Sequence, residues 1–147
     1  MKGALFGCSV LAVVLAVTAA AATQDPILTR KKLMDANGAS AGAAAAMIKG
    51  EAAFNPKVAM AALQTFNSVS YAFGDYFPEG SDKGDTSASP KIWQDKEGFA
   101  KALTQFQTDS EAALKSKPQD VDALKAAMGS IGKNCQSCHE NFRVKKS

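Results

Sequence analysis

The sequence predicts an all-α protein, an antiparallel four-helix bundle. Four stretches repeat apolar residues at steps of three and four, the spacing that puts side chains on one face of a helix. Runs of β-branched residues are scarce after the first segment, whereas Ala, Leu, Lys and Gln are plentiful. Only one of the connections between these stretches is long, and short connections favour antiparallel neighbours.

Length and charge limit the classes of protein that fit. A chain of 147 residues suits a single domain with a sizeable core. The formal net charge is only +3, and no basic run is interleaved with aromatic residues. We therefore expect no nucleic-acid partner.

Residues 1–22 are predicted to be a secretory signal peptide. Lys2 is followed by an uncharged apolar run over 5–17 and by small residues over 18–22, as in a cleavage region. The alternative is an uncleaved membrane anchor, since the uncharged stretch 3–24 is just long enough to span a bilayer. The alanine-rich end favours cleavage, which leaves a mature domain over 23–147 without stable membrane insertion.

The first mature helix is expected to start at Asp25-Pro26, a capping residue followed by proline at the first helical position. Gly50 is expected to end it in a left-handed conformation. From 38 to 46 the chain holds only Gly, Ala and Ser, so either a neighbouring helix comes close or a bulky group fills the space. The predicted inward stripe is Ile27, Lys31, Met34, Gly38, Ala41, Ala45 and Ile48.

The second helix is expected to start at Asn55-Pro56 and to end at Phe77-Pro78. Residues 79–90 are rich in Gly, Ser, Asp and Thr and read as a long loop. The predicted inward stripe of this helix is Ala59, Leu63, Phe66, Ser70, Phe73 and Phe77.

The third helix is expected from near Asp95, and the fourth from Pro118, with Asp120 and Asp122 in its first turn. Phe99, Leu103, Phe106, Ser110, Ala113 and Leu114 form the buried face of the third helix. The stripe of the fourth helix reads Val121, Leu124, Met128, Ile131, Cys135, Cys138 and Phe142.

The last helix carries Cys135, Cys138 and His139 in the pattern C-x-x-C-H, the attachment motif of a c-type haem. On a helix these positions share one face, so both sulfurs can bond to the porphyrin edge while the imidazole reaches the iron. A redox dithiol would need a βαβ setting, and a structural zinc would need about four ligands. Because both cysteines lie on the apolar stripe, we expect one covalent haem per chain inside the bundle.

Four helices with C-x-x-C-H near the C-terminus, followed by Phe142 and Arg143, resemble the class II c-type cytochromes, the cytochrome c′ group. The segments 30–34 (Arg-Lys-Lys-Leu-Met), 49–50 and 90–93 also resemble family landmarks. The resemblance covers essentially the whole mature chain.

The resemblance implies that His139 is the proximal iron ligand and that position 34 faces the distal side. Low-spin members carry a coordinating Met there, whereas five-coordinate members often carry Leu or Phe. Here the residue is Met34. Arg30 is a candidate contact for a haem propionate, with a solvated surface arginine as the alternative.

The function expected from these residues is that of a periplasmic electron-transfer cytochrome, low-spin and ligated by His139 and Met34, and not an enzyme. The alternative is a five-coordinate protein that binds or sequesters nitric oxide or carbon monoxide. The expected partners are redox proteins that dock transiently, and a homodimer through the first two helices is a further possibility.

Overall fold

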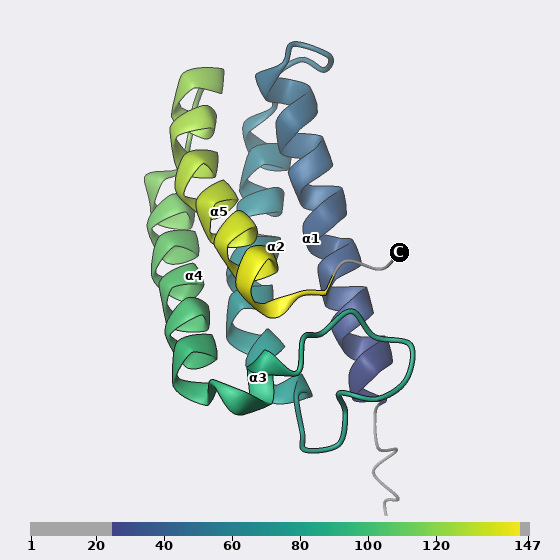
Figure 1. Cartoon of the computed structure of the whole chain (residues 1–147). Coiled ribbons are helices and arrows are strands. Elements are labelled where there is room, and N and C mark those ends of the chain that lie inside the picture. Colours follow the sequence, from purple (N-terminus) through teal and green to yellow (C-terminus); the bar gives the residue numbers. More distant parts are fainter. Residues whose placement is uncertain (1–24, 145–147) are drawn as a thin grey trace, which may run out of the picture.

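The computed structural model describes residues 25–144, and they form the predicted antiparallel four-helix bundle (Figure 1). The predicted signal peptide over 1–22 lies outside the described residues, and its boundary with the domain stays a prediction. No described helix is long and apolar enough to cross a membrane. The long helices are α1 (Pro26–Ile48), α2 (Pro56–Ala72), α4 (Lys96–Ser116) and α5 (Val121–Phe142).

Two short elements lie between α2 and α4. The second helix, predicted to run on to Phe77, tightens after Ala72 into a 3-10 turn, η1 (Phe73–Tyr76). A single-turn helix, α3 (Lys91–Gln94), precedes α4 and was not predicted as a separate element. Asp95 separates α3 from α4 because its backbone leaves the helical region, with φ of −123° and ψ of 64°.

Side-chain caps start each long helix. The carboxylate of Asp25 accepts hydrogen bonds from two backbone N–H groups of α1, and Asn55 does the same for α2. Asp95 caps α4 and Asp120 caps α5, so the last helix begins three residues after the predicted Pro118. Gly50, predicted as the left-handed residue after the first helix, has a φ of 74°.

The inward face of α1 differs from the prediction by about one residue. Its buried side chains are Arg30, Ala44 and Met47, whereas Lys31 and Gly38 of the predicted stripe are exposed. The predicted inward face was wrong because a search for apolar spacing does not count an arginine as an inward residue, although Arg30 is buried. The buried stripes of α2, α4 and α5 agree with the prediction at Leu63, Phe66, Ser70, Phe99, Ser110, Leu124 and Ile131.

The core is arranged in three clusters along the bundle. One end joins α1, α2 and α5 through Ala44, Met47, Ala59 and Leu124. In the middle, Ala41 and Cys135 pack from opposite helices against a cluster that includes Ile131. The other end holds Ile92, Phe99 and Phe142. The sequence numbers rise along α1 as they fall along α5, which confirms that these helices are antiparallel.

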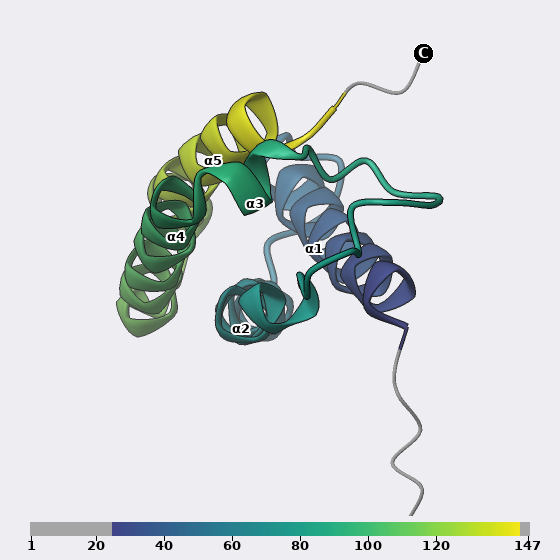
Figure 2. The ribbon, with the colours of Figure 1, turned by 60° about the horizontal axis from the view of Figure 1, so that its bottom comes forward.

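The segment 77–90 crosses from the end of η1 past the start of α1 to the end of α5 (Figure 2). Beyond α5 the chain pairs with this segment, since Ala88 and Arg143 form an isolated antiparallel β-bridge. The backbone N–H of Ser89 donates to the Phe142 carbonyl at 3.0 Å, and that of Val144 donates to the Ser87 carbonyl at 2.9 Å. The crossover segment is therefore attached to the end of the helix that carries the C-x-x-C-H motif.

Candidate functional site

The last two turns of α5 present Cys135, Cys138 and His139. Both thiols are half-buried and neither forms a disulfide. Cys135 packs against the middle cluster, and Cys138 packs against the cluster formed by Ile92, Phe99 and Phe142. The two sulfurs therefore lie at the interior side of the helix, whereas His139 next to them is exposed.

The residues around the motif shift the pKa values of its two thiols and its imidazole. Burial raises the pKa of both thiols, and for Cys138 the neighbouring Cys135 adds to the rise. Partial burial, with the charge of Arg143 adding to it, lowers the pKa of His139. The imidazole is therefore neutral at pH 7, which is the form that binds a metal.

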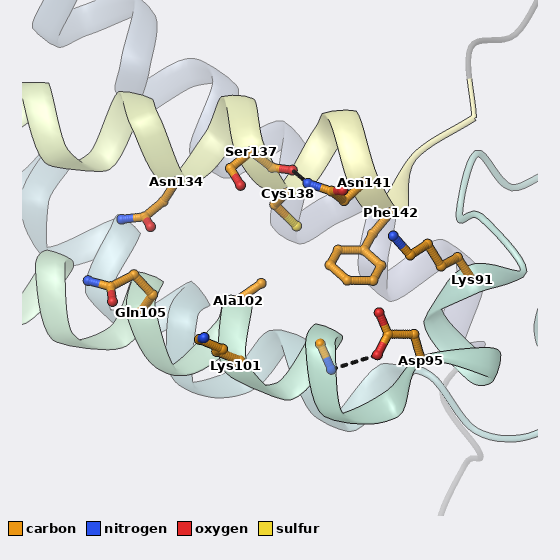
Figure 3. A pocket seen from close by; sticks show the side chains of 11 residues that line it. Lys91, Asp95, Lys101, Ala102, Gln105, Asn134, Ser137, Cys138, Asn141 and Phe142 are labelled. Carbon is orange, nitrogen blue, oxygen red and sulfur yellow. Dashed lines mark hydrogen bonds between the residues drawn. The ribbon is translucent and has the colours of Figure 1, made fainter.

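A cavity of about 350 Å³ lies between α4 and α5 beside the motif. Figure 3 shows the sulfur of Cys138 pointing into it from α5, with Lys101, Ala102 and Gln105 facing it from α4. Phe142 forms its apolar end, and Asn134 lies at the other end. The second attachment cysteine therefore borders this open space on one side and the Ile92, Phe99 and Phe142 cluster on the other.

Met34 lies on α1 at the level of the motif. Along α1 it is seven residues before Ala41, and along α5 Cys138 is seven residues after Ile131. Ala41 and Ile131 belong to the same cluster, so they lie at about the same height along the bundle. Seven residues span about 10 Å of helix. Because α1 and α5 are antiparallel, the step back from Ala41 to Met34 and the step forward from Ile131 to Cys138 point in the same direction. Met34 and Cys138 therefore lie at matching heights, and the Met34 side chain is half-buried.

Met47 and Met128 have a structural role. Met47 is only 2% exposed and belongs to the cluster at the far end of the bundle. Its sulfur also accepts a hydrogen bond from the backbone N–H of Asn55 at 3.4 Å. Met128 packs against two of the core clusters. Met34 is distinguished by its position along α1 rather than by its residue type.

Arg30 is buried, with 4% of its surface exposed, and its guanidinium is held by the crossover segment. Nη1 donates to the Tyr76 carbonyl and to Ser81 Oγ at 3.1 and 3.0 Å. Nη2 donates to the Ser81 carbonyl and to Thr86 Oγ1 at 2.8 and 3.2 Å. Burial lowers the pKa of this group, yet an arginine remains charged. With both Nη groups occupied, the Nε–H is the donor left for a haem propionate.

Asn37 is a site residue that the sequence reasoning missed. Its Oδ1 is buried and accepts no hydrogen bond among residues 25–144. It lies three residues after Met34, on a neighbouring position of the same face of α1. An orphaned buried acceptor indicates that a further group or an ordered water belongs beside it. The sequence feature that could have identified Asn37 is that it is the one amide residue between Met34 and the small-residue stretch 38–46.

The donor set suits a haem better than a bare metal ion. Within the described part of the chain, no three His, Cys, Asp or Glu side chains gather as ion ligands. Two unpaired sulfurs at the interior, a neutral imidazole beside them, space at Cys138 and an orphaned polar atom on the facing helix fit a covalently held porphyrin.

Comparisons with known proteins agree with this assignment. A family model described as Cytochrome C′ matches residues 25–143. Cytochrome c-556 of Agrobacterium fabrum is 34% identical over 142 residues, covering 97% of this chain and 92% of that protein. Cytochrome c′ of Rhodopseudomonas palustris is 38% identical over 136 residues, covering 92% of each.

Solved structures show the same bundle. The structure of cytochrome c′ from Rhodopseudomonas palustris has a TM-score of 0.78 at 38% identity and covers 84% of this chain and 98% of that one. A structural model of oxidised cytochrome c556 from the same organism has a TM-score of 0.75 at 35% identity, with coverages of 84% and 99%.

A four-helix bundle whose last helix ends in C-x-x-C-H defines a haem-carrying cytochrome of the helix-bundle class. The chain belongs to the cytochrome c′ family, whose members are electron-carrying proteins with covalently attached haem c.

Proposed function

We propose that this protein is an exported, periplasmic electron carrier in which Cys135 and Cys138 hold the haem covalently. His139 binds the iron on the proximal side and Met34 binds it on the distal side. The observation that carries the proposal is the position of Met34, at the height of the motif on the helix that runs antiparallel to α5. With His139 and Met34 both bound to the iron, no substrate site would remain there, and the proposed protein would act as a carrier and not as an enzyme.

The residues of this chain set the conditions for electron transfer. The haem supplies one-electron chemistry at its iron. A soft thioether from Met34 favours the ferrous state and so raises the reduction potential. The lowered pKa of His139 keeps its imidazole available as a ligand across the neutral range. Each cysteine packs on one side against an apolar cluster of the core.

The alternative function is binding of a small gas at a five-coordinate iron. A cytochrome c′ from Alcaligenes xylosoxidans, 25% identical, has been solved as a ferrous variant with bound NO. On α1, Gly38 and Gly42 have open space where a side chain would begin. Both glycines are exposed, so this space lies on the outer face of α1 and does not favour gas entry by itself.

Absorption spectra of the haem-loaded protein, oxidised and reduced, with and without carbon monoxide, distinguish the two functions. A low-spin spectrum that carbon monoxide does not change supports ligation by Met34. The Met34→Leu variant should then become high-spin and bind the gas, whereas Met60→Leu, a half-buried methionine of α2, should behave as the parent does. A high-spin, gas-sensitive parent protein would establish the alternative instead.

The partners proposed for the carrier are redox proteins that dock briefly through weak electrostatics. A homodimer through α1 and α2 remains part of the proposal, since Gly38, Ala39 and Gly42 of α1 are exposed and small. Sedimentation of the haem-loaded protein over a range of concentrations tests it. A single monomeric species throughout that range contradicts the dimer.

A further inference from the structure

The crossover segment 77–90 links the helix that carries the proposed distal ligand to the helix that carries the haem motif. On the α5 side, it is joined to the chain by the backbone bonds of Ser87 and Ser89. On the α1 side, it is held by Arg30 and by an exposed ion pair between Lys31 and Asp85. One continuous segment therefore bridges the two ligand-bearing helices.

Arg30 makes the buried part of this link. Its two Nη groups bind oxygen atoms of Tyr76, Ser81 and Thr86, so one guanidinium gathers residues ten positions apart in the chain. The accepting oxygens are themselves fixed, because Ser81 Oγ donates to the Pro78 carbonyl at 2.8 Å and Thr86 Oγ1 accepts from Ala88 N–H at 3.1 Å. The planar fork of arginine makes these contacts together, which the single ammonium of a lysine does not.

A second route from Arg30 to α5 runs through aromatic rings. The guanidinium carbon lies 4.6 Å from the centroid of the Phe77 ring. Phe77 meets Phe99 edge-on at 4.8 Å, and Phe99 meets Phe142 at 5.3 Å. Phe142 is the last residue of α5, four positions after Cys138.

Arg30 attaches the first half of α1 to the crossover segment. The buried side chains of α1 are Arg30, Ala44 and Met47, so only Arg30 is buried before position 44. Met34 lies one helical turn after Arg30 on the same face. The contacts of Arg30 with the crossover segment therefore act one helical turn away from Met34.

We propose that Arg30 is a positioning residue for Met34, and that segment 77–90 acts as a strap that holds the first half of α1 against the haem-bearing end of α5. The inference rests on the proposed function, because its consequence at the iron concerns Met34. When the strap is intact, α1 stays close to α5 and the distal side is closed. When Arg30 loses its fork contacts, the first half of α1 separates more often and the distal side opens.

The test uses the haem-loaded full chain with the variants Arg30→Lys and Thr86→Val. The first keeps the charge but removes the fork, and the second removes one acceptor of the fork without touching Arg30. Lys32→Met is the matched control, since Lys32 is an exposed residue of the same helical turn. The readouts are hydrogen exchange of backbone amides over 27–37 and 79–90, and the rate at which carbon monoxide binds the ferrous protein.

We expect Arg30→Lys to speed hydrogen exchange over both segments about tenfold, in proportion to the open fraction. Carbon monoxide should then bind the ferrous variant at a measurable rate, whereas the low-spin parent does not respond to the gas. Thr86→Val should act in the same direction with a smaller effect, and Lys32→Met should match the parent. Unchanged exchange and gas binding in Arg30→Lys would overturn the inference. So would a response to Arg30→Lys with none to Thr86→Val, because Arg30 would then act by another contact, such as a propionate.

The result for the strap can be told apart from the result for ligation of the iron by Met34. If the parent is already high-spin, Met34 is not a ligand and the proposed function fails. The strap is then judged from the exchange rates and from the ratio of gas-binding rates between variant and parent. If the parent is low-spin and Met34→Leu opens the iron, the proposed function holds whatever Arg30→Lys does.

Discussion

The guanidinium of Arg30 lies over the ring of Phe77, with 4.6 Å between the guanidinium carbon and the ring centroid. The same ring makes edge-on contacts with Phe73 at 5.0 Å and Phe99 at 4.8 Å. A buried cation, the crossover segment and the aromatic cluster therefore meet at one side chain. Phe77 stabilises this end of the bundle by packing and by attraction between the cation and the ring face.

Replacing Phe77 with leucine removes these ring contacts while keeping an apolar side chain of similar bulk. We expect the Phe77→Leu variant to lose about 1–2 kcal/mol of free energy of unfolding. Denaturant unfolding followed by far-ultraviolet circular dichroism measures the change. Phe54→Leu is the control, because Phe54 is also a half-buried phenylalanine but packs at the opposite end of the bundle. An equal loss of unfolding free energy in both variants would mean that the ring contacts of Phe77 add no extra stability.

The covalent attachment of the haem can be tested at the two sulfurs. The Cys135→Ser, Cys138→Ser double variant should lose its haem when it is denatured, because a serine hydroxyl forms no thioether. Each single variant should retain the haem less well than the parent. Haem staining after denaturing electrophoresis and the mass of the intact chain measure retention, and Ser137→Ala within the motif serves as control. Covalent haem in the double variant would contradict the assignment.

Lys117, between α4 and α5, has a left-handed backbone with φ of 46° and ψ of 60°. A residue with a Cβ atom is strained in this region, whereas glycine is not. We expect Lys117→Gly to raise the free energy of unfolding by about 0.5–1 kcal/mol. The matched control is Lys125→Gly, an exposed position inside α5, where glycine should instead cost about 1 kcal/mol. Destabilisation by Lys117→Gly would show that the lysine side chain itself is needed at the turn.

Tyr71 and Glu111 form a hydrogen-bonded pair on the surface between α2 and α4. The bond to Glu111 raises the pKa of the Tyr71 hydroxyl and lowers that of the carboxyl, which Lys115 lowers further. The lowered carboxyl pKa favours the folded state at neutral pH, and this contribution is lost as the pH falls through the pKa of folded Glu111.

Tyr71 should therefore titrate above the ordinary pKa of tyrosine, and Glu111→Gln should lower its pKa. Nuclear magnetic resonance of labelled tyrosine resolves it, since the chain has two tyrosines and Tyr76→Phe removes the other signal. The same pKa for Tyr71 with and without Glu111 would contradict the pairing.

The sequence predicted the parts of this protein that follow local rules. The caps at Asp25 and Asn55, the helix start near Asp95 and the left-handed Gly50 are local signals, and all four are confirmed. The C-x-x-C-H motif is equally local, so its place at the interior side of α5 could be predicted.

The inward face of α1 could not be predicted from apolar spacing, because Arg30 is buried by contacts with residues 46 to 56 positions away. The same holds for Asn37, whose orphaned oxygen becomes evident only when the neighbouring helices are in place. The pairing of segment 77–90 with the chain after α5 is also long-range, and no periodic pattern in the sequence predicts it.

The two helices proposed to supply axial ligands are the first and the last of the described chain, and they pack side by side. Iron bound by both Met34 and His139 would therefore act as a cross-link that closes a loop of roughly 100 residues, which is worth about 4–5 kcal/mol in chain entropy by analogy with a disulfide. A molecule that displaces the thioether would open this loop. The free energy of unfolding of the whole protein would then report on events at a single coordination position.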